Sequence, residues 1–170
     1  MRPGEIVSIA LFFGAIAGLT AISSKKIGEA DREAALAAAI KAEFHWVPGF
    51  SVYSKDHDPS TIDTLCLESR EAYDLKSLSG HLSDTILRPV PVSSCRREIE
   101  EGDFGMFTAV FHHFGPRDES AAHLKVVQIE CQTSSSCTID IDGFGGGNRH
   151  FIERKGQDWQ VVKSQMLWVV

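Results

Sequence analysis

Four cysteines occur along the 170-residue chain, and two of them enclose a short serine-rich segment between two stretches of alternating polarity. When Cys131 is placed opposite Cys137, a single hairpin register gives both strands one apolar and one polar face, because side chains alternate along a strand with a period of two. The apolar pairs are then Ile129 with Ile139 and Val127 with Ile141, and the polar pairs are Glu130 with Thr138 and Gln128 with Asp140. The alternation therefore predicts an antiparallel hairpin with the serines at its tip.

The same register predicts how the cysteines pair. Directly opposed strand residues have Cβ atoms about 4.5–5.5 Å apart, close to disulfide spacing, so a Cys131–Cys137 bridge is expected. Of the three possible connectivities, this choice leaves Cys66–Cys95 as the second bridge. Zinc sites need ligand pairs two to four residues apart, and no Cys-x-x-Cys redox motif is present. We therefore expect structural disulfides, no metal and no cofactor.

An unbroken apolar segment, Ile6 to Ile22, lies near the start of the chain. It follows Arg2, and Ala15-Ile16-Ala17 provides the small residues that a signal peptidase reads, with Ala21 as a second candidate cleavage point. The segment is also 17 residues long, the lower limit for a membrane-spanning helix, so an uncleaved anchor is the alternative. Either interpretation of residues 1–21 places the rest of the chain in an oxidising compartment, periplasmic or secreted, where disulfides persist.

The charge distribution argues against nucleic acid as a partner. The net charge is −6, and the basic residues form only isolated pairs such as Lys25-Lys26 and Arg96-Arg97. Binding to nucleic acid requires clustered basic side chains that displace counterions, and no such cluster is present.

Hydrophobic periodicity predicts two helices followed by a series of strands. The segment 28–44 has a stripe formed by Leu36, Ile40 and Phe44, and the segment 74–87 places four leucines or isoleucines on one face. Strands are expected at 50–54, 64–69, 106–114, 123–131, 137–144, 149–155 and 159–169. This order predicts a single α+β domain over residues 28–170, with about five antiparallel strands from residue 105 onward and two helices packed on one face.

Two adjacent histidines, His112 and His113, lie within an apolar predicted strand. Neighbouring strand residues point to opposite faces, so the pair cannot chelate one ion. A hairpin after Phe114 would bring His123 close and create a pocket lined by histidines. The alternative is a histidine that is simply hydrogen-bonded within the sheet.

Two further segments carry candidate functional residues. Asp140 and Asp142 share one strand face, with His150 expected across the next hairpin, and a solvated strand face is the default interpretation. The glycine-rich segment 143–148 has no lysine or opening helix after it and does not resemble a phosphate-binding loop. It is interpreted as a hairpin turn or bulge, with a recognition loop presenting Phe144 as the functional alternative.

The C-terminal part resembles a recurring pattern in small exported bacterial proteins of unknown function. The residues that carry this resemblance are Arg88-Pro-Val-Pro-Val-Ser-Ser-Cys95 and Phe151-Ile-Glu-Arg-Lys-Gly-Gln-Asp-Trp-Gln-Val161. The charged turn followed by Trp-x-Val also resembles the last strand pair of NTF2-like α+β domains. The resemblance covers roughly half of the chain. It implies a curved antiparallel sheet with helices in its concavity, and it transfers no catalytic residue.

Three functions remain open at this point. The first is an exported, non-enzymatic module that binds a protein or cell-envelope component, since the chain has none of the common hydrolase motifs. The second is an NTF2-like domain that binds or hydrolyses a small molecule through His112 or His113, with Tyr73 or Asp84 as a polar partner. The third is an accessory subunit of an envelope complex, anchored to the membrane by residues 6–22.

Overall fold

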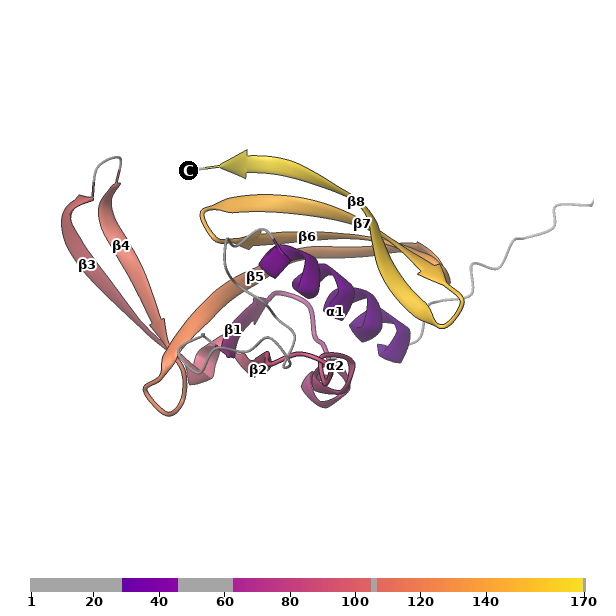
Figure 1. Ribbon diagram of the computed structural model, residues 1–170, viewed down its shortest axis with the longest axis horizontal. Coiled ribbons are helices and arrows are strands. Elements are labelled where there is room, and N and C mark those ends of the chain that lie inside the picture. The colour runs from indigo at the N-terminus through magenta and orange to yellow at the C-terminus, as the bar shows by residue number, and fades with distance from the viewer. Residues whose placement is uncertain (1–28, 46–62, 105–106, 170) are drawn as a thin grey trace, which may run out of the picture.

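The computed structural model describes residues 29–45, 63–104 and 107–169, which form a mixed α+β fold with two helices and eight strands (Figure 1). The predicted strand 50–54 and the apolar segment 6–22 lie outside these residues. The helices are α1 (Glu29–His45) and α2 (Leu75–His81), with a short 3-10 turn at Val92–Ser94. The strands are β1 (Thr64–Ser69), β2 (Arg88–Pro91), β3 (Arg96–Phe104), β4 (Phe107–Phe114), β5 (Ser120–Thr133), β6 (Ser136–Gly143), β7 (Gly146–Lys155) and β8 (Asp158–Val169).

The sheet is larger than expected, and it is not purely antiparallel. Its main path runs in the order β2-β1-β5-β6-β7-β8, with β3 and β4 paired beside β5. Strand β1 lies parallel to both β2 and β5, with Cys66 level with Val90 on one side and with His123 on the other. The connection from β1 to β2 passes through α2, as a crossover between parallel neighbours requires. The five strands expected after residue 105 are present as β4 to β8, and each pairs antiparallel with its neighbour. The expectation of a purely antiparallel sheet of about five strands is nevertheless wrong, because the sheet has eight strands and β1 joins it in parallel.

The hairpin register predicted from the cysteines is confirmed near the tip and changes further along β5. Cys131 lies opposite Cys137, and Ile129 lies opposite Ile139. A β-bulge then places Val126, rather than Val127, opposite Ile141. Val126 is buried, and Val127 is 38% exposed. A bulge adds one residue to one strand and so reverses the faces beyond it, which a strict period of two does not anticipate.

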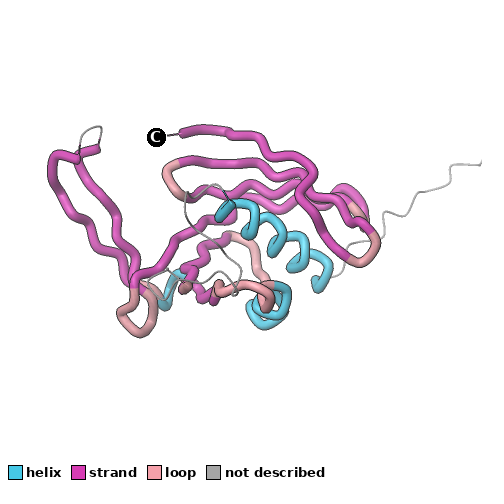
Figure 2. The backbone as a smooth tube through the Cα atoms, viewed as in Figure 1, coloured by secondary structure: helices cyan, strands magenta, loops and turns pink. Residues whose placement is uncertain are grey.

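Strands β3 and β4 form an arm that stands away from the rest of the sheet (Figures 1 and 2). Every described side chain of β3 from Arg96 to Gly102 is exposed. No strand was expected at 96–104, because an element that is exposed on both faces needs no apolar alternation.

The core lies between α1 and the sheet. The predicted stripe of Leu36, Ile40 and Phe44 is buried, and the alanines at 35, 37 and 39 widen it. Helix α1 packs on β6, β7 and β8, while α2 packs against α1 and β2. Both helices contribute to one apolar cluster with the inner face of the sheet.

Helix α2 begins where the sequence predicts and ends earlier. Asp74 is its N-cap and accepts a hydrogen bond from the Lys76 amide at 2.9 Å. The helix ends at His81 rather than Leu87, because the Thr85 hydroxyl bonds the Leu82 carbonyl at 2.6 Å and forms a local turn. Leu82 and Leu87 nevertheless remain in the core.

Both predicted disulfides are present, Cys66–Cys95 and Cys131–Cys137. The first joins β1 to the residue that precedes β3, so it fixes the base of the arm. The second closes the tip of the β5–β6 hairpin. Disulfides of this kind are typical of an oxidising, extracellular environment. Within the described ranges, no helix is long and apolar enough to cross a membrane.

Candidate binding cleft

One edge of β5 pairs with two different strands in succession. Strand β4 pairs with β5 only at its base, where His113 lies opposite Ala121. Strand β6 joins the same edge at Leu124, because β1 occupies the other edge from Ala121 onward. Between these points β4 and β6 diverge, and Ala122 and His123 have no strand partner on that edge. The sheet is therefore forked at this position.

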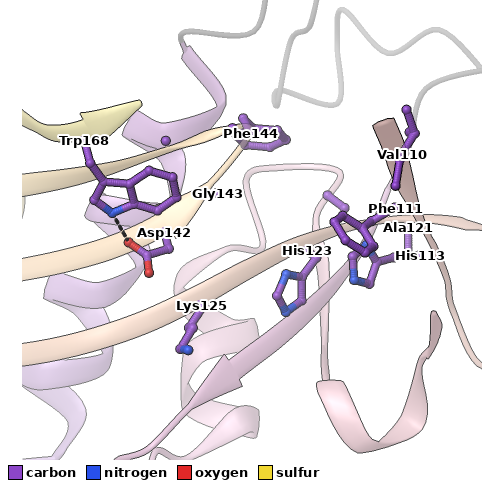
Figure 3. Close-up of a pocket in the computed structure, with 14 residues that line it drawn as sticks. Val110, Phe111, His113, Ala121, His123, Lys125, Asp142, Gly143, Phe144 and Trp168 are labelled. Carbon is purple, nitrogen blue, oxygen red and sulfur yellow. Dashed lines mark hydrogen bonds between the residues drawn. The ribbon is translucent and has the colours of Figure 1, made fainter. Parts of the chain in front are cut away.

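A cleft of about 650 Å³ lies in this fork, within the size range of ligand sites. Its walls come from the arm, from β5, from the β6–β7 turn and from the end of β8 (Figure 3). Apolar side chains line most of it, namely Ala109, Val110, Phe111, Ala121, Ala122, Phe144 and Trp168.

The polar part of the cleft is a pair of stacked histidines. The rings of His113 and His123 lie 4.5 Å apart between centroids and are nearly parallel (Figure 3). Burial lowers the pKa of His113, and the nearby charges of His123 and Arg97 lower it further. Burial also lowers the pKa of His123, although Glu68 acts in the opposite direction from 3.4 Å. Both imidazoles are therefore predominantly neutral at pH 7.

Trp168 forms the wall opposite the arm. Its indole Nε1 donates a hydrogen bond to Asp142 Oδ1 at 3.1 Å (Figure 3). The ring lies over Gly147, where a Cβ atom would come within 2.2 Å of Nε1. This glycine is therefore required because the tryptophan occupies the space of a side chain.

Phe144 stands at the tip of the β6–β7 turn. It is half exposed and has φ 46°, a left-handed conformation that Gly145 shares at φ 82°. Left-handed backbone costs roughly 1–2 kcal/mol for a residue with a Cβ atom. Its ring packs edge-on against Phe44 of α1, with centroids 5.0 Å apart. The glycine-rich segment is thus a hairpin turn, as predicted, and it presents an aromatic side chain to the cleft.

The unpaired edge of β4 faces this cleft with its backbone. The Gly115 amide bonds the Glu119 carbonyl at 2.7 Å across the β4–β5 turn. In an antiparallel strand, the N–H and C=O groups of successive residues point alternately to its two edges. The backbone groups of His113, Phe111 and Ala109 therefore point to the same edge as the Gly115 amide, toward β5. His113 pairs with Ala121 of β5 at this edge, whereas β4 has diverged from β5 at Phe111 and Ala109, and their backbone groups face the cleft.

The structure brings together only some of the predicted site residues. His113 and Phe144 both line the cleft, and His123 lies beside His113 as the predicted hairpin required. His112 points away, 3.0 Å from Glu100 on the arm, so the two adjacent histidines occupy opposite faces. Tyr73 lies elsewhere, near the Leu67 carbonyl at 3.4 Å. Asp84, its proposed alternative, pairs with Lys41 of α1.

The expectation of a solvated Asp140 is wrong. The residue is 7% exposed, and its carboxylate bonds the Arg149 guanidinium twice, at 2.8 and 2.7 Å. His150 is not near it, because Asp140 lies opposite Arg149, and the next side chain along β7 points to the helix-covered face. His150 is fully buried there against Glu43, a contact that no local pattern signals.

The cleft combines unpaired strand backbone, aromatic walls and two neutral imidazoles, which suits the binding of an extended, largely apolar segment. No model of a known protein family matches the chain, and neither a curated protein nor a solved structure is significantly similar to it. The function is therefore inferred from the geometry of the cleft.

Proposed function

We propose that this protein is an exported, disulfide-stabilised module that binds an extended segment of a partner polypeptide in the cleft between β4 and the β6–β7 turn. The observation that carries the proposal is the fork in the sheet. It leaves the N–H and C=O groups of Ala109 and Phe111 directed into a cleft whose walls are aromatic. An incoming strand would pair with these groups and extend the β3–β4 ribbon on its open side.

The side chains around the edge indicate what kind of segment binds. Phe111, Phe144 and Trp168 are each about half exposed, an arrangement suited to receiving apolar or aromatic side chains from the segment. The neutral histidines offer hydrogen bonds without a net charge. Lys125 is the basic side chain of the lining, and Glu68 lies 3.5 Å from its ammonium group. The preferred partner is therefore an apolar strand rather than a strongly charged one.

Export is the second part of the proposal. It rests on the two disulfides and on the apolar segment 6–22, which serves either as a cleaved signal peptide or as a membrane anchor. A periplasmic or secreted location follows from cleavage, and a role as an anchored accessory subunit follows from retention.

The test uses peptides of known sequence. The oxidised protein is used to select binders from a displayed library of random peptides, and the selected peptides are measured against two variants. Ala109→Pro removes the cleft-facing amide and leaves the β3 ladder intact, because this amide does not point to β3. Ala109→Ser keeps the amide and is the matched control. We expect Ala109→Pro to weaken binding at least tenfold and Ala109→Ser to change it less than twofold. Equal binding to both variants would remove the proposal.

The stacked histidines favour one other candidate, a small-molecule site of the kind suggested by the resemblance to NTF2-like domains. In that case the ligand would contact the imidazoles rather than the β4 backbone. His113→Gln with His123→Gln would then abolish binding, and Ala109→Pro would not affect it. The same pair of variants therefore distinguishes the two candidates.

A further inference from the structure

A second cavity of about 290 Å³ lies on the side of Trp168 that faces the helices. Its polar lining consists of Glu43, Asn148 and Ser164, and its apolar lining includes Phe144, Met166 and Trp168. The polar groups come from three different elements, α1, β7 and β8. They converge on His150, which lies beneath them with no exposed surface.

These side chains form a continuous hydrogen-bonded relay. The hydroxyl oxygen of Ser164 lies 2.9 Å from His150 Nδ1, and His150 Nε2 lies 2.5 Å from Glu43 Oε1. Glu43 is 2% exposed, and its other oxygen accepts a hydrogen bond from Asn148 Nδ2 at 3.2 Å. The relay consists of Ser164, His150 and Glu43. Ser164 and Glu43 line the cavity, and of the three residues only Ser164 is half-buried rather than buried.

The direction of the relay follows from hydrogen-bonding rules. An ionised carboxylate can only accept, so His150 Nε2 carries the proton that binds Glu43. When the imidazole is neutral, Nδ1 has a lone pair and accepts the hydrogen bond from the Ser164 hydroxyl. A serine bonded to an unprotonated imidazole nitrogen, with the imidazole oriented by a carboxylate, is the arrangement that activates a serine nucleophile.

We propose that Ser164 is the nucleophile of an acyl-transfer site, with His150 as its general base and Glu43 as the positioning residue. The substrate class is a small ester with an apolar acyl group, because the cavity is small and its walls are Phe144, Met166 and Trp168. This site shares Phe144 and Trp168 with the peptide cleft, but it does not depend on the function proposed for that cleft.

The Ser164 oxygen attacks the ester carbonyl carbon while its proton passes to His150 Nδ1, and the carbonyl electron pair moves to oxygen. The second amide hydrogen of Asn148 is available to this oxyanion, since its bond to Glu43 uses only one. Collapse of the intermediate expels the alkoxide, which takes the proton from Nδ1. Water then hydrolyses the acyl-serine by the same sequence and restores the hydroxyl.

The test is covalent labelling of the oxidised full-length protein with a fluorophosphonate, which transfers phosphorus to an activated serine and releases fluoride. Intact-mass and peptide analysis should show a single adduct at Ser164. The adduct should be lost in Ser164→Ala and retained in Ser136→Ala, a matched half-buried serine that bonds Thr133 instead of a histidine. The loss expected on removing the nucleophile is at least about 100-fold in labelling rate.

A second variant separates catalysis from folding. Glu43→Gln keeps an acceptor for Nε2 and the size of the side chain while it removes the charge that favours the imidazolium. We expect its far-ultraviolet circular dichroism to be unchanged, its labelling to slow at least about tenfold, and the pH profile of labelling to shift. Absence of any adduct in the folded wild-type protein, an adduct that survives in Ser164→Ala, or an unchanged rate in Glu43→Gln would each overturn the proposal.

Discussion

Glu43 of α1 and His150 of β7 are 107 residues apart in the sequence and are joined by a buried contact of 2.5 Å between Oε1 and Nε2. Neither side chain is more than 2% exposed. The contact fixes the last turn of α1 against β7, and Glu43 also lines the smaller cavity. It therefore connects the stability of the fold with the position of Phe144, which packs on the neighbouring Phe44.

The first prediction concerns this pair. Glu43→Ala leaves a buried imidazole N–H without its acceptor and should lower the free energy of unfolding by about 1–3 kcal/mol. Lys41→Ala, which removes the partner of the 58% exposed Asp84 side chain, is the control and should cost no more than about 1 kcal/mol. Urea denaturation measures both values. Similar losses in the two variants would show that the buried pair has no special role.

The second prediction concerns Gly147. A Cβ atom at this position would lie 2.2 Å from Trp168 Nε1 and 2.7 Å from Asp142 Oδ1. Gly147→Ala should therefore displace the indole, shift its N–H resonance in the NMR spectrum and weaken peptide binding in the cleft. Gly80→Ala places a methyl group in open space on α2 and should instead stabilise the protein by up to about 1 kcal/mol. An unchanged Trp168 resonance in Gly147→Ala would contradict the prediction.

The third prediction concerns pH. Burial lowers the pKa values of His113 and His123 below the unfolded value of about 6.5. Between the folded and unfolded pKa values the unfolded chain binds more protons, so stability is complete above pH about 6.5 and falls as the pH decreases through the folded pKa values. Protonation adds positive charge beside Arg97 and Lys125, partly offset by Glu68, so peptide binding should also weaken in this range.

The measurement is an NMR titration of the imidazole resonances, with urea midpoints at pH 7 and pH 5. In the variant with His113→Gln and His123→Gln, the pH dependence of the urea midpoint should become smaller. A pKa at or above the unfolded value for both rings would contradict the stacked, partly buried geometry.

The fourth prediction separates the two disulfides. Cys66–Cys95 closes a loop with a sequence separation of 29, and its removal should cost about 3.5 kcal/mol. Cys131–Cys137 closes a loop with a separation of 6 and should cost about 2 kcal/mol. Only the first bridge fixes the base of the arm. Double serine variants should therefore both lower stability, and only the Cys66/Cys95 variant should weaken peptide binding when measured at a temperature where both remain folded.

The β5–β6 hairpin illustrates how much of the fold can be predicted from the sequence. The two cysteines and the alternation of Ile129 and Ile139 defined its register, because local pairing across a short turn leaves few alternatives. The bulge at Val127 was not predictable in the same way, since it depends on how β5 bends to meet β1 as well as β6. The parallel position of β1 likewise has no local signal, because the order of strands in a sheet is set by tertiary packing.

The candidate sites were predicted only where local geometry determines them. The proximity of His113 and His123 followed from a hairpin between them, and this geometry is confirmed. The unpaired edge of β4 could not be anticipated, because it results from β4 and β6 sharing one edge of β5. Ser164, His150 and Glu43 come from three elements, and only the folded chain brings them together.

The most direct test of peptide binding by strand addition is residue-specific amide hydrogen exchange in β4. In the free protein, the amides of Val110 and His112 should exchange slowly because they bond β3, whereas those of Ala109 and Phe111 should exchange quickly because they face the cleft. Addition of a selected peptide should slow exchange at Ala109 and Phe111. Saturating binding that leaves both of these amides unprotected would contradict the account.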